Sequence, residues 1–134
     1  MPKKHRAPFR VMLVEDEEDF RRILAGLLLA KFPSMMLEEA ADGKEAIERI
    51  RDFIPHLVFI DIQLPGENGL EVTRRIKALF PDTKVVILTS YDVPEYREAA
   101  RACGAYQFLS KGICTAEEIE NLVKGLCEIR TPVP

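Results

Sequence analysis

The stretch Leu57–Glu71, LVFIDIQLPGENGLE, holds the pattern that decides the fold. Its first four residues are consecutive and apolar, which is typical of a strand covered on both faces, as in a parallel sheet. Asp61 follows directly, and the segment Pro65–Gly69 supplies turn residues. Asn68, with Glu71 three positions later, is the sequence signature of a helix start. The stretch therefore predicts a buried strand, a loop that begins with a carboxylate, and a helix.

Short runs of β type recur along the chain and alternate with helical patterns. The runs are Phe9–Val14, Met35–Ala40, Leu57–Ile60, Val85–Thr89 and Tyr106–Leu109. Most of them are nearly continuous in apolar residues, as strands between two helical layers should be. Met35–Ala40 is more polar, which indicates an edge of the sheet.

The segments between these runs have apolar residues at helical spacing. In the first segment the stripe consists of Phe20, Ile23, Leu24, Leu27 and Leu28, and in the last segment it consists of Ile119, Leu122, Val123 and Leu126. Helix starts are predicted at Asn68, Asp92 and Thr115, each of which has a Glu three residues later. Stop signals are Pro33, Pro55, Pro81 and Gly104.

The order of these elements predicts a single α/β domain. Five β–α units in succession imply a parallel sheet with helices on both faces. A closed barrel would need eight units, so we expect an open, doubly wound sheet. In such sheets the ligand site lies beyond the carboxyl ends of the strands.

The composition excludes several classes of protein. The 134 residues are 47% hydrophobic and 31% charged, which is typical of one globular domain. No apolar run approaches the ~18 residues of a membrane span, and no secretory signal is present. The net charge of −3 argues against nucleic-acid binding by this chain alone. Three cysteines without C-x-x-C spacing argue against a zinc site or a disulfide framework and favour a reducing cytoplasm.

Charged and hydroxyl side chains follow the predicted strands at their carboxyl ends. They are Glu15, Asp16, Asp61, Thr89, Ser90 and Lys111. Because parallel strands end at one edge, we expect these side chains to share a crevice, with Thr89 and Lys111 at an exposed cleft. Clustered carboxylates repel one another unless a cation neutralises them, and oxygen ligands select a hard cation such as Mg²⁺. Magnesium beside a carboxylate, a hydroxyl and a lysine is typical of phosphoryl transfer.

Four motifs resemble those of the response-regulator receiver domains of two-component signalling. They are VEDEEDF (Val14–Phe20), VFIDIQLPGENGLE (Val58–Glu71), VVILTSY (Val85–Tyr91) and FLSKG (Phe108–Gly112). The resemblance covers Phe9 to Glu128. It implies a flavodoxin-like (βα)5 fold with strand order 2-1-3-4-5. It also implies a phosphoacceptor switch rather than an enzyme, with only self-phosphorylation from a donor and slow autodephosphorylation.

The resemblance implies a role for each residue of the site. Asp61 would take a phosphoryl group from the phosphohistidine of a sensor histidine kinase or a phosphotransfer protein. Mg²⁺ would be bound by Asp16, Asp61 and the backbone carbonyl of Gln63. Glu15 would reach the metal through water, and Lys111 would pair with the phosphoryl group.

Two further residues would carry the signal away from the site. The Thr89 hydroxyl would bond a phosphoryl oxygen, and Phe108 would move inward with Thr89. The surface of the fourth helix, the fifth strand and the fifth helix would change and promote a homodimer. Taken by itself, Thr89 is also typical of a strand, and its neighbour Ser90 offers a second hydroxyl one position later. Phe108 is also typical of a core.

Two positions depart from the family pattern. Glu15 stands where Asp is more usual, which shifts the expected water-mediated contact with the metal. Gly112 follows Lys111 where the family often has a proline in a cis peptide, so we expect a trans bond here. Gly112 also resembles the variant found in receivers attached to helix-turn-helix outputs of the NarL/FixJ type.

Other functions fit the sequence less well. A haloacid-dehalogenase-type phosphatase also uses an Asp after a strand, but the residue two positions past Asp61 is Gln63, which cannot shuttle a proton. In a flavodoxin-like FMN module, the acidic run Glu15–Asp19 would repel the phosphate. No P-loop or G-x-G-x-x-G occurs. A receiver that serves only as a scaffold is disfavoured because all the chemical positions are filled.

Both ends of the chain read as tails around the receiver domain, which is assigned to residues 9–128. Residues 1–8 form a basic tail, and residues 129–134 (IRTPVP) form a tail or the start of a linker. We expect an output beyond residue 134 that controls transcription. The alternative is a stand-alone receiver that acts by protein–protein contact or as a phosphorelay intermediate. We expect a cytoplasmic location, no membrane contact and no DNA binding by this chain alone.

Overall fold

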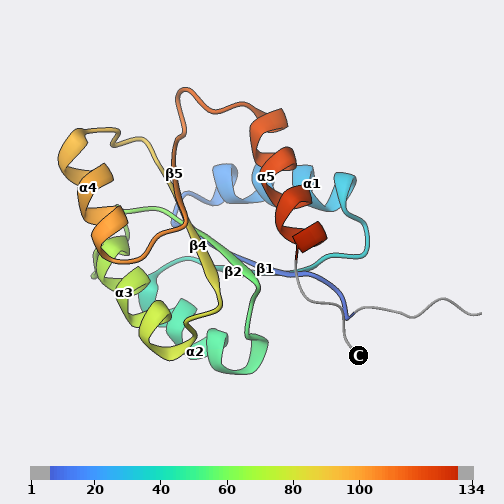
Figure 1. The fold of residues 1–134 in the computed structure, drawn as a ribbon, viewed down its shortest axis with the longest axis horizontal. Helices are drawn as coiled ribbons and strands as arrows, with labels where there is room; N and C mark the ends of the chain where they lie inside the picture. The colour runs from blue at the N-terminus through green and yellow to red at the C-terminus, as the bar shows by residue number, and fades with distance from the viewer. Residues whose placement is uncertain (1–6, 130–134) are drawn as a thin grey trace, which may run out of the picture.

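Strands of four to six residues form a five-stranded parallel sheet in the computed structural model, which describes residues 7–129 (Figure 1). The strands are β1 (Arg10–Val14), β2 (Met36–Ala40), β3 (Leu57–Ile60), β4 (Lys84–Thr89) and β5 (Gln107–Ser110). Their order in the sheet is β2-β1-β3-β4-β5. The expected fold class and strand order are therefore confirmed, and the polar second strand does lie at an edge.

Two layers of helices cover the sheet (Figure 1). The helices are α1 (Glu18–Lys31), α2 (Gly43–Phe53), α3 (Gly69–Leu79), α4 (Pro94–Ala102) and α5 (Ala116–Ile129). Helices α1 and α5 pack on one face, and helices α2, α3 and α4 pack on the other. The central strands β1, β3 and β4 are thus buried on both sides, which explains their nearly continuous apolar residues.

Alternate residues of each strand point into different cores. In β1, Val11 and Leu13 belong to the core under α1 and α5, whereas Met12 and Val14 belong to the core under α2, α3 and α4. All four side chains are fully or almost fully buried. The period of two along a strand therefore divides the interior into two apolar clusters.

Two of the three predicted helix starts are formed by the predicted residues. Before α5, Glu118 donates its N–H to Thr115 Oγ1 (3.1 Å), and Thr115 donates its N–H to Glu118 Oε1 (3.2 Å). This reciprocal pair is the capping box that the sequence predicts. Before α3, Asn68 Oδ1 accepts a hydrogen bond from the N–H of Leu70 at 2.7 Å.

The third predicted helix start, Asp92, is wrong by one residue. The cap of α4 is Val93, and Pro94 occupies the first turn. Proline there fixes the start of the helix, since it needs no hydrogen bond for its backbone nitrogen. The carboxylate of Asp92 instead accepts two hydrogen bonds from Arg97.

The assigned tails lie largely outside the described residues. This holds for residues 1–6 and 130–134, so the domain boundaries remain a prediction. From residue 7 to residue 129, no helix combines the length and the apolar character needed to cross a bilayer.

Candidate functional site

Three carboxylates meet at the carboxyl ends of β1 and β3. Glu15, Asp16 and Asp61 each offer an oxygen, and these oxygens lie within 4.8 Å of one another. Glu15 and Asp61 are each only 5% exposed, whereas Asp16 is open to solvent. The crevice expected from the strand ends is therefore present, and it combines two buried carboxylates with an accessible one.

The ammonium group of Lys111 lies between the two buried carboxylates. Its Nζ atom is 2.6 Å from Glu15 Oε1 and 2.9 Å from Asp61 Oδ2. The carboxylate of Glu17 is farther away, at 3.8 Å. The same nitrogen lies 4.3 Å from the centre of the Phe20 ring, so the aromatic face adds a favourable contact with the cation.

The charges at the site do not cancel. Burial raises the pKa of Glu15 above its ordinary value, although the hydrogen bond from Lys111 lowers it. Burial alone would lower the pKa of Lys111, but its hydrogen bonds to Glu15 and Asp61 more than offset this and raise it. One ammonium group thus faces three clustered carboxylates, and this oxygen-rich surplus of negative charge fits a hard divalent cation such as Mg²⁺.

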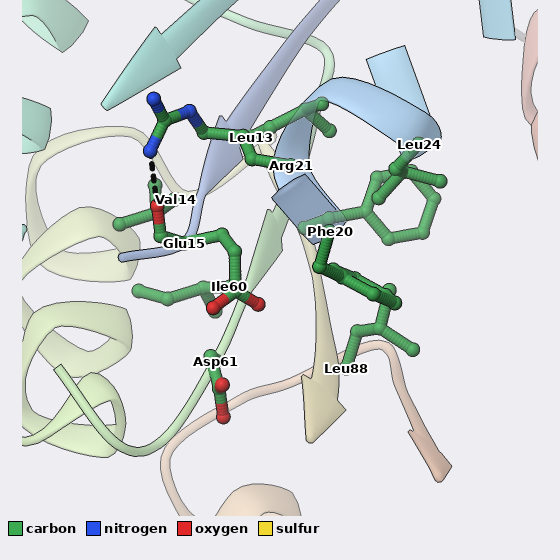
Figure 2. A pocket seen from close by; sticks show the side chains of 10 residues that line it. Leu13, Val14, Glu15, Phe20, Arg21, Leu24, Ile60, Asp61 and Leu88 are labelled. Atoms are coloured by element: carbon green, nitrogen blue, oxygen red, sulfur yellow. Dashed lines mark hydrogen bonds between the residues drawn. The ribbon is translucent and has the colours of Figure 1, made fainter. Parts of the chain in front are cut away.

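A partly buried arginine, Arg21, fixes the loop that carries Glu15 (Figure 2). Arg21 donates from Nη1 to the backbone oxygen of Glu15 at 2.7 Å, as the dashed line in Figure 2 marks. It also donates from Nε to Glu39 Oε1 at 2.8 Å. Beneath the carboxylates, a cavity of about 10 Å³ is lined by Glu15, Asp61, Phe20 and Arg21, among others. The sequence reasoning missed Arg21, because no motif shows that a residue of the first helix contacts the strand end and the edge strand together.

The loop after β3 holds Asp61 in place through a close backbone approach. Gly69 donates its N–H to the Ile62 oxygen at 2.8 Å, and a Cβ atom at Gly69 would overlap the backbone oxygen of Asp61. The N–H of Gln63 approaches Asp61 Oδ1 at 3.3 Å. The first turn of α3 is therefore packed directly on the backbone of Asp61, which restricts the direction of its side chain.

The expectation of an exposed cleft for Thr89 and Lys111 is wrong. Thr89 is completely buried, and the Lys111 side chain is 9% exposed. Thr89 is the last residue of β4 and is paired with Ser110 of β5, and its Oγ1 accepts the N–H of Tyr91 at 3.3 Å. The Lys111 stem is covered because its ammonium group turns inward to the carboxylates. Ser90 is exposed, so Thr89 is the inward-facing hydroxyl.

Phe108 lies on β5 and belongs to the core under α2, α3 and α4, where it is half-buried. It lines a surface pocket of about 370 Å³ next to α4, together with Arg97, Arg101 and Tyr106.

The peptide bond after Lys111 is trans, as expected. Within residues 7–129 no peptide bond is cis, so Lys111 and Gly112 are joined by a trans bond.

The chain matches the family model of the response regulator receiver domain over residues 11–124. It is 31% identical over 126 residues to the transcriptional activator protein ExaE of Pseudomonas putida. This match covers 92% of this chain and 59% of that protein. It is also 38% identical over 108 residues to the two-component response regulator ORR41 of Oryza sativa subsp. japonica. This match covers 79% of this chain and 85% of that protein.

Among solved structures, the fold is similar to that of a two-component response regulator of the LuxR family from Aurantimonas sp. SI85-9A1. The TM-score is 0.80 at 29% sequence identity, and the match covers 95% of this chain and 91% of that chain. The chain spans 53–59% of the length of several bacterial relatives that it matches, including ExaE.

Proposed function

Because this chain belongs to the response regulator receiver domain family, we propose that Asp61 accepts a phosphoryl group from the phosphohistidine of a sensor histidine kinase or a phosphotransfer protein. The observation that carries this proposal is the position of Asp61, a buried carboxylate within 2.9 Å of the Lys111 ammonium and next to Glu15 and Asp16. A carboxylate at such a site can act as a nucleophile and form an acyl phosphate.

The transfer is a displacement at phosphorus. An oxygen of Asp61 forms the new O–P bond while the N–P bond of the phosphohistidine breaks. The electron pair of that bond leaves on the imidazole nitrogen. Lys111, which is already within hydrogen-bond distance of Asp61, turns from the carboxylate to an oxygen of the arriving phosphoryl group.

The cluster of carboxylates supports a magnesium site. Asp16, Asp61 and the backbone carbonyl of Gln63 would hold the ion directly, and Glu15 would hold it through water. When bound, Mg²⁺ would neutralise the charge on the phosphoryl oxygens. Glu15 already contacts Lys111 at 2.6 Å, which supports a role for this residue in orienting the lysine as well as in holding metal-bound water.

Thr89 and Phe108 would convert phosphorylation into a change of surface. The Thr89 hydroxyl would bond a phosphoryl oxygen, and Phe108 would move inward with it. The change would reach the surface formed by α4, β5 and α5 and promote a homodimer. A two-state element that is biased by a new charge is sufficient for such a switch.

The output that we propose is control of transcription, through a NarL/FixJ-type domain that lies beyond residue 134. The names of two matched proteins, a transcriptional activator and a LuxR-family regulator, favour this output. This domain by itself would bind no DNA, and it would work in the cytoplasm, where histidine kinases present their phosphohistidine. A stand-alone receiver that acts through protein contacts is the second candidate, favoured by the match that covers 85% of the ORR41 protein.

The test is modification by acetyl phosphate, read by intact mass with Mg²⁺ or with EDTA. We expect the mass of one phosphoryl group to be added with Mg²⁺ and lost in Asp61→Asn. Asp82→Asn is the matched control, because Asp82 is an exposed carboxylate that lies outside the site. Modification that persists in Asp61→Asn would overturn the assignment, and equal modification in EDTA would overturn the metal requirement.

A further inference from the structure

The ring of Phe108 lies under a guanidinium group that is itself fixed. The Cζ atom of Arg97, on α4, is 4.7 Å from the centre of the Phe108 ring. The edge of the same guanidinium group is held by Asp92, with Nε at 2.6 Å from Oδ1 and Nη2 at 3.0 Å from Oδ2. A planar guanidinium group can satisfy a carboxylate along its edge and an aromatic ring with its face at the same time.

This arrangement is connected to Thr89 through a short run of chain. The N–H of Tyr91 donates to Thr89 Oγ1 at 3.3 Å, and Asp92 is the next residue. Asp92 fixes Arg97, and Arg97 covers Phe108. The hydroxyl of Thr89 and the ring of Phe108 are therefore joined by consecutive contacts.

Open space lies beside the ring. The pocket of about 370 Å³ is lined by Phe108, Arg97, Arg101 and Tyr106, so the side of the ring that faces this pocket is not closed by core packing. Arg97 lines the same pocket, and its guanidinium group contacts the ring. The hydrogen bonds from Arg97 lower the pKa of Asp92, the direction that favours the charged carboxylate.

We propose that Arg97, oriented by Asp92, is a positioning residue that holds Phe108 in the conformation seen here and opposes its inward movement. The Asp92–Arg97 pair and the Phe108 ring are called the clamp below. The effect on signalling rests on the proposed function, because it requires the ring to move when Asp61 is modified. The clamp itself belongs to the unmodified protein and can be tested without any phosphoryl group.

The first test reads the ring in the unmodified protein by NMR of ¹³C-labelled phenylalanine. The chain has seven phenylalanines, so Phe108→Leu is used to assign the Phe108 resonances. Arg97→Ala should shift these resonances, Asp92→Asn should shift them less, and Arg97→Lys should restore part of the wild-type position. Arg74→Ala is the matched control, because Arg74 is also an exposed arginine of a helix, paired with Glu71. Unchanged Phe108 resonances in Arg97→Ala would overturn the clamp.

The second test measures the coupling with beryllofluoride and Mg²⁺, which stand in for the phosphoryl group. In Arg97→Ala the concentration for half-saturation should fall by about two- to fivefold, the range that the loss of an exposed cation–π contact can produce. Arg74→Ala should leave it unchanged. Equal half-saturation in wild type and Arg97→Ala, with a shifted ring, would overturn the coupling. Failure of the wild type to take up beryllofluoride would overturn the proposed function, and the ring resonances would still decide the clamp.

Discussion

The ammonium group of Lys111 lies closer to Glu15 than to Asp61, at 2.6 Å against 2.9 Å. Glu15 has one methylene more than the aspartate that is usual at this position of the family. The lysine therefore has a second acceptor, which keeps it at the site when Asp61 changes its charge or its partners. The contact holds the Lys111 side chain in the interior of the domain, where it is 9% exposed.

Lys111→Ala should lower the free energy of unfolding by about 1–3 kcal/mol, because it leaves two buried carboxylates without their common partner. Chemical denaturation in EDTA measures this loss, and millimolar Mg²⁺ should reverse part of it. Lys124→Ala, at an exposed position of α5, is the control and should stay within about 0.5 kcal/mol of the wild type. A Lys111→Ala protein as stable as this control would show that the lysine serves the reaction alone.

Gly69→Ala should destabilise the domain by about 1–3 kcal/mol and reduce modification of Asp61, because the added methyl group displaces the Asp61 backbone. Gly125→Ala is a matched control in α5, where a Cβ atom meets nothing within 4 Å. That control should stabilise the domain by about 0.5–1 kcal/mol, since alanine favours helix interiors. Thermal melting of both variants tests the pair, and a harmless Gly69→Ala would contradict the close approach.

Thr115→Ala should cost about 1 kcal/mol, because the first turn of α5 loses the side-chain oxygen that accepts the Glu118 N–H. Thr115→Ser keeps the oxygen and should retain most of the stability. Denaturant titration of the two variants separates the cap from the loss of a methyl group. If the serine variant is as unstable as the alanine variant, the capping box contributes nothing measurable.

Asp92 should titrate below its ordinary range, because its hydrogen bonds with Arg97 lower its pKa. The folded pKa then lies below the unfolded value, so the pair contributes stability above the unfolded pKa and loses it as pH falls through the folded pKa. Carboxyl-carbon NMR across the acid range gives the midpoint. Arg97→Ala should raise that midpoint, whereas Arg74→Ala should leave it where the wild type has it. An unchanged midpoint in Arg97→Ala would remove the electrostatic basis of the pair.

The sequence predicts the elements well wherever one local pattern decides them. The run Leu57–Ile60 is a strand with the predicted bounds, because four buried apolar residues are bounded by polar ones. The last strand begins and ends one residue later than expected, at Gln107 and Ser110. Both of its terminal residues are polar, so the apolar pattern does not mark its ends, and hydrogen bonding to β4 sets the bounds instead.

The site is predictable to the extent that strand ends place it. Glu15, Asp16, Asp61 and Lys111 come together because each follows a parallel strand. The burial of Thr89 depends on the neighbouring strand and loop, which the residue types do not specify. The contacts of Arg21 and Arg97 depend on the rotation of α1 and α4 over the sheet, and a single sequence gives no pattern for these rotations.

The sheet separates two apolar interiors, one under α1 and α5 and the other under α2, α3 and α4. Helix residues on opposite faces are separated by the sheet, so the effects of their substitution on stability should add. The clamp residue Phe108 packs on the second interior, whereas Val123 of α5 lies in the first. A substitution in one helical layer, whether it arises by drift or by engineering, should therefore need no compensating substitution in the other layer.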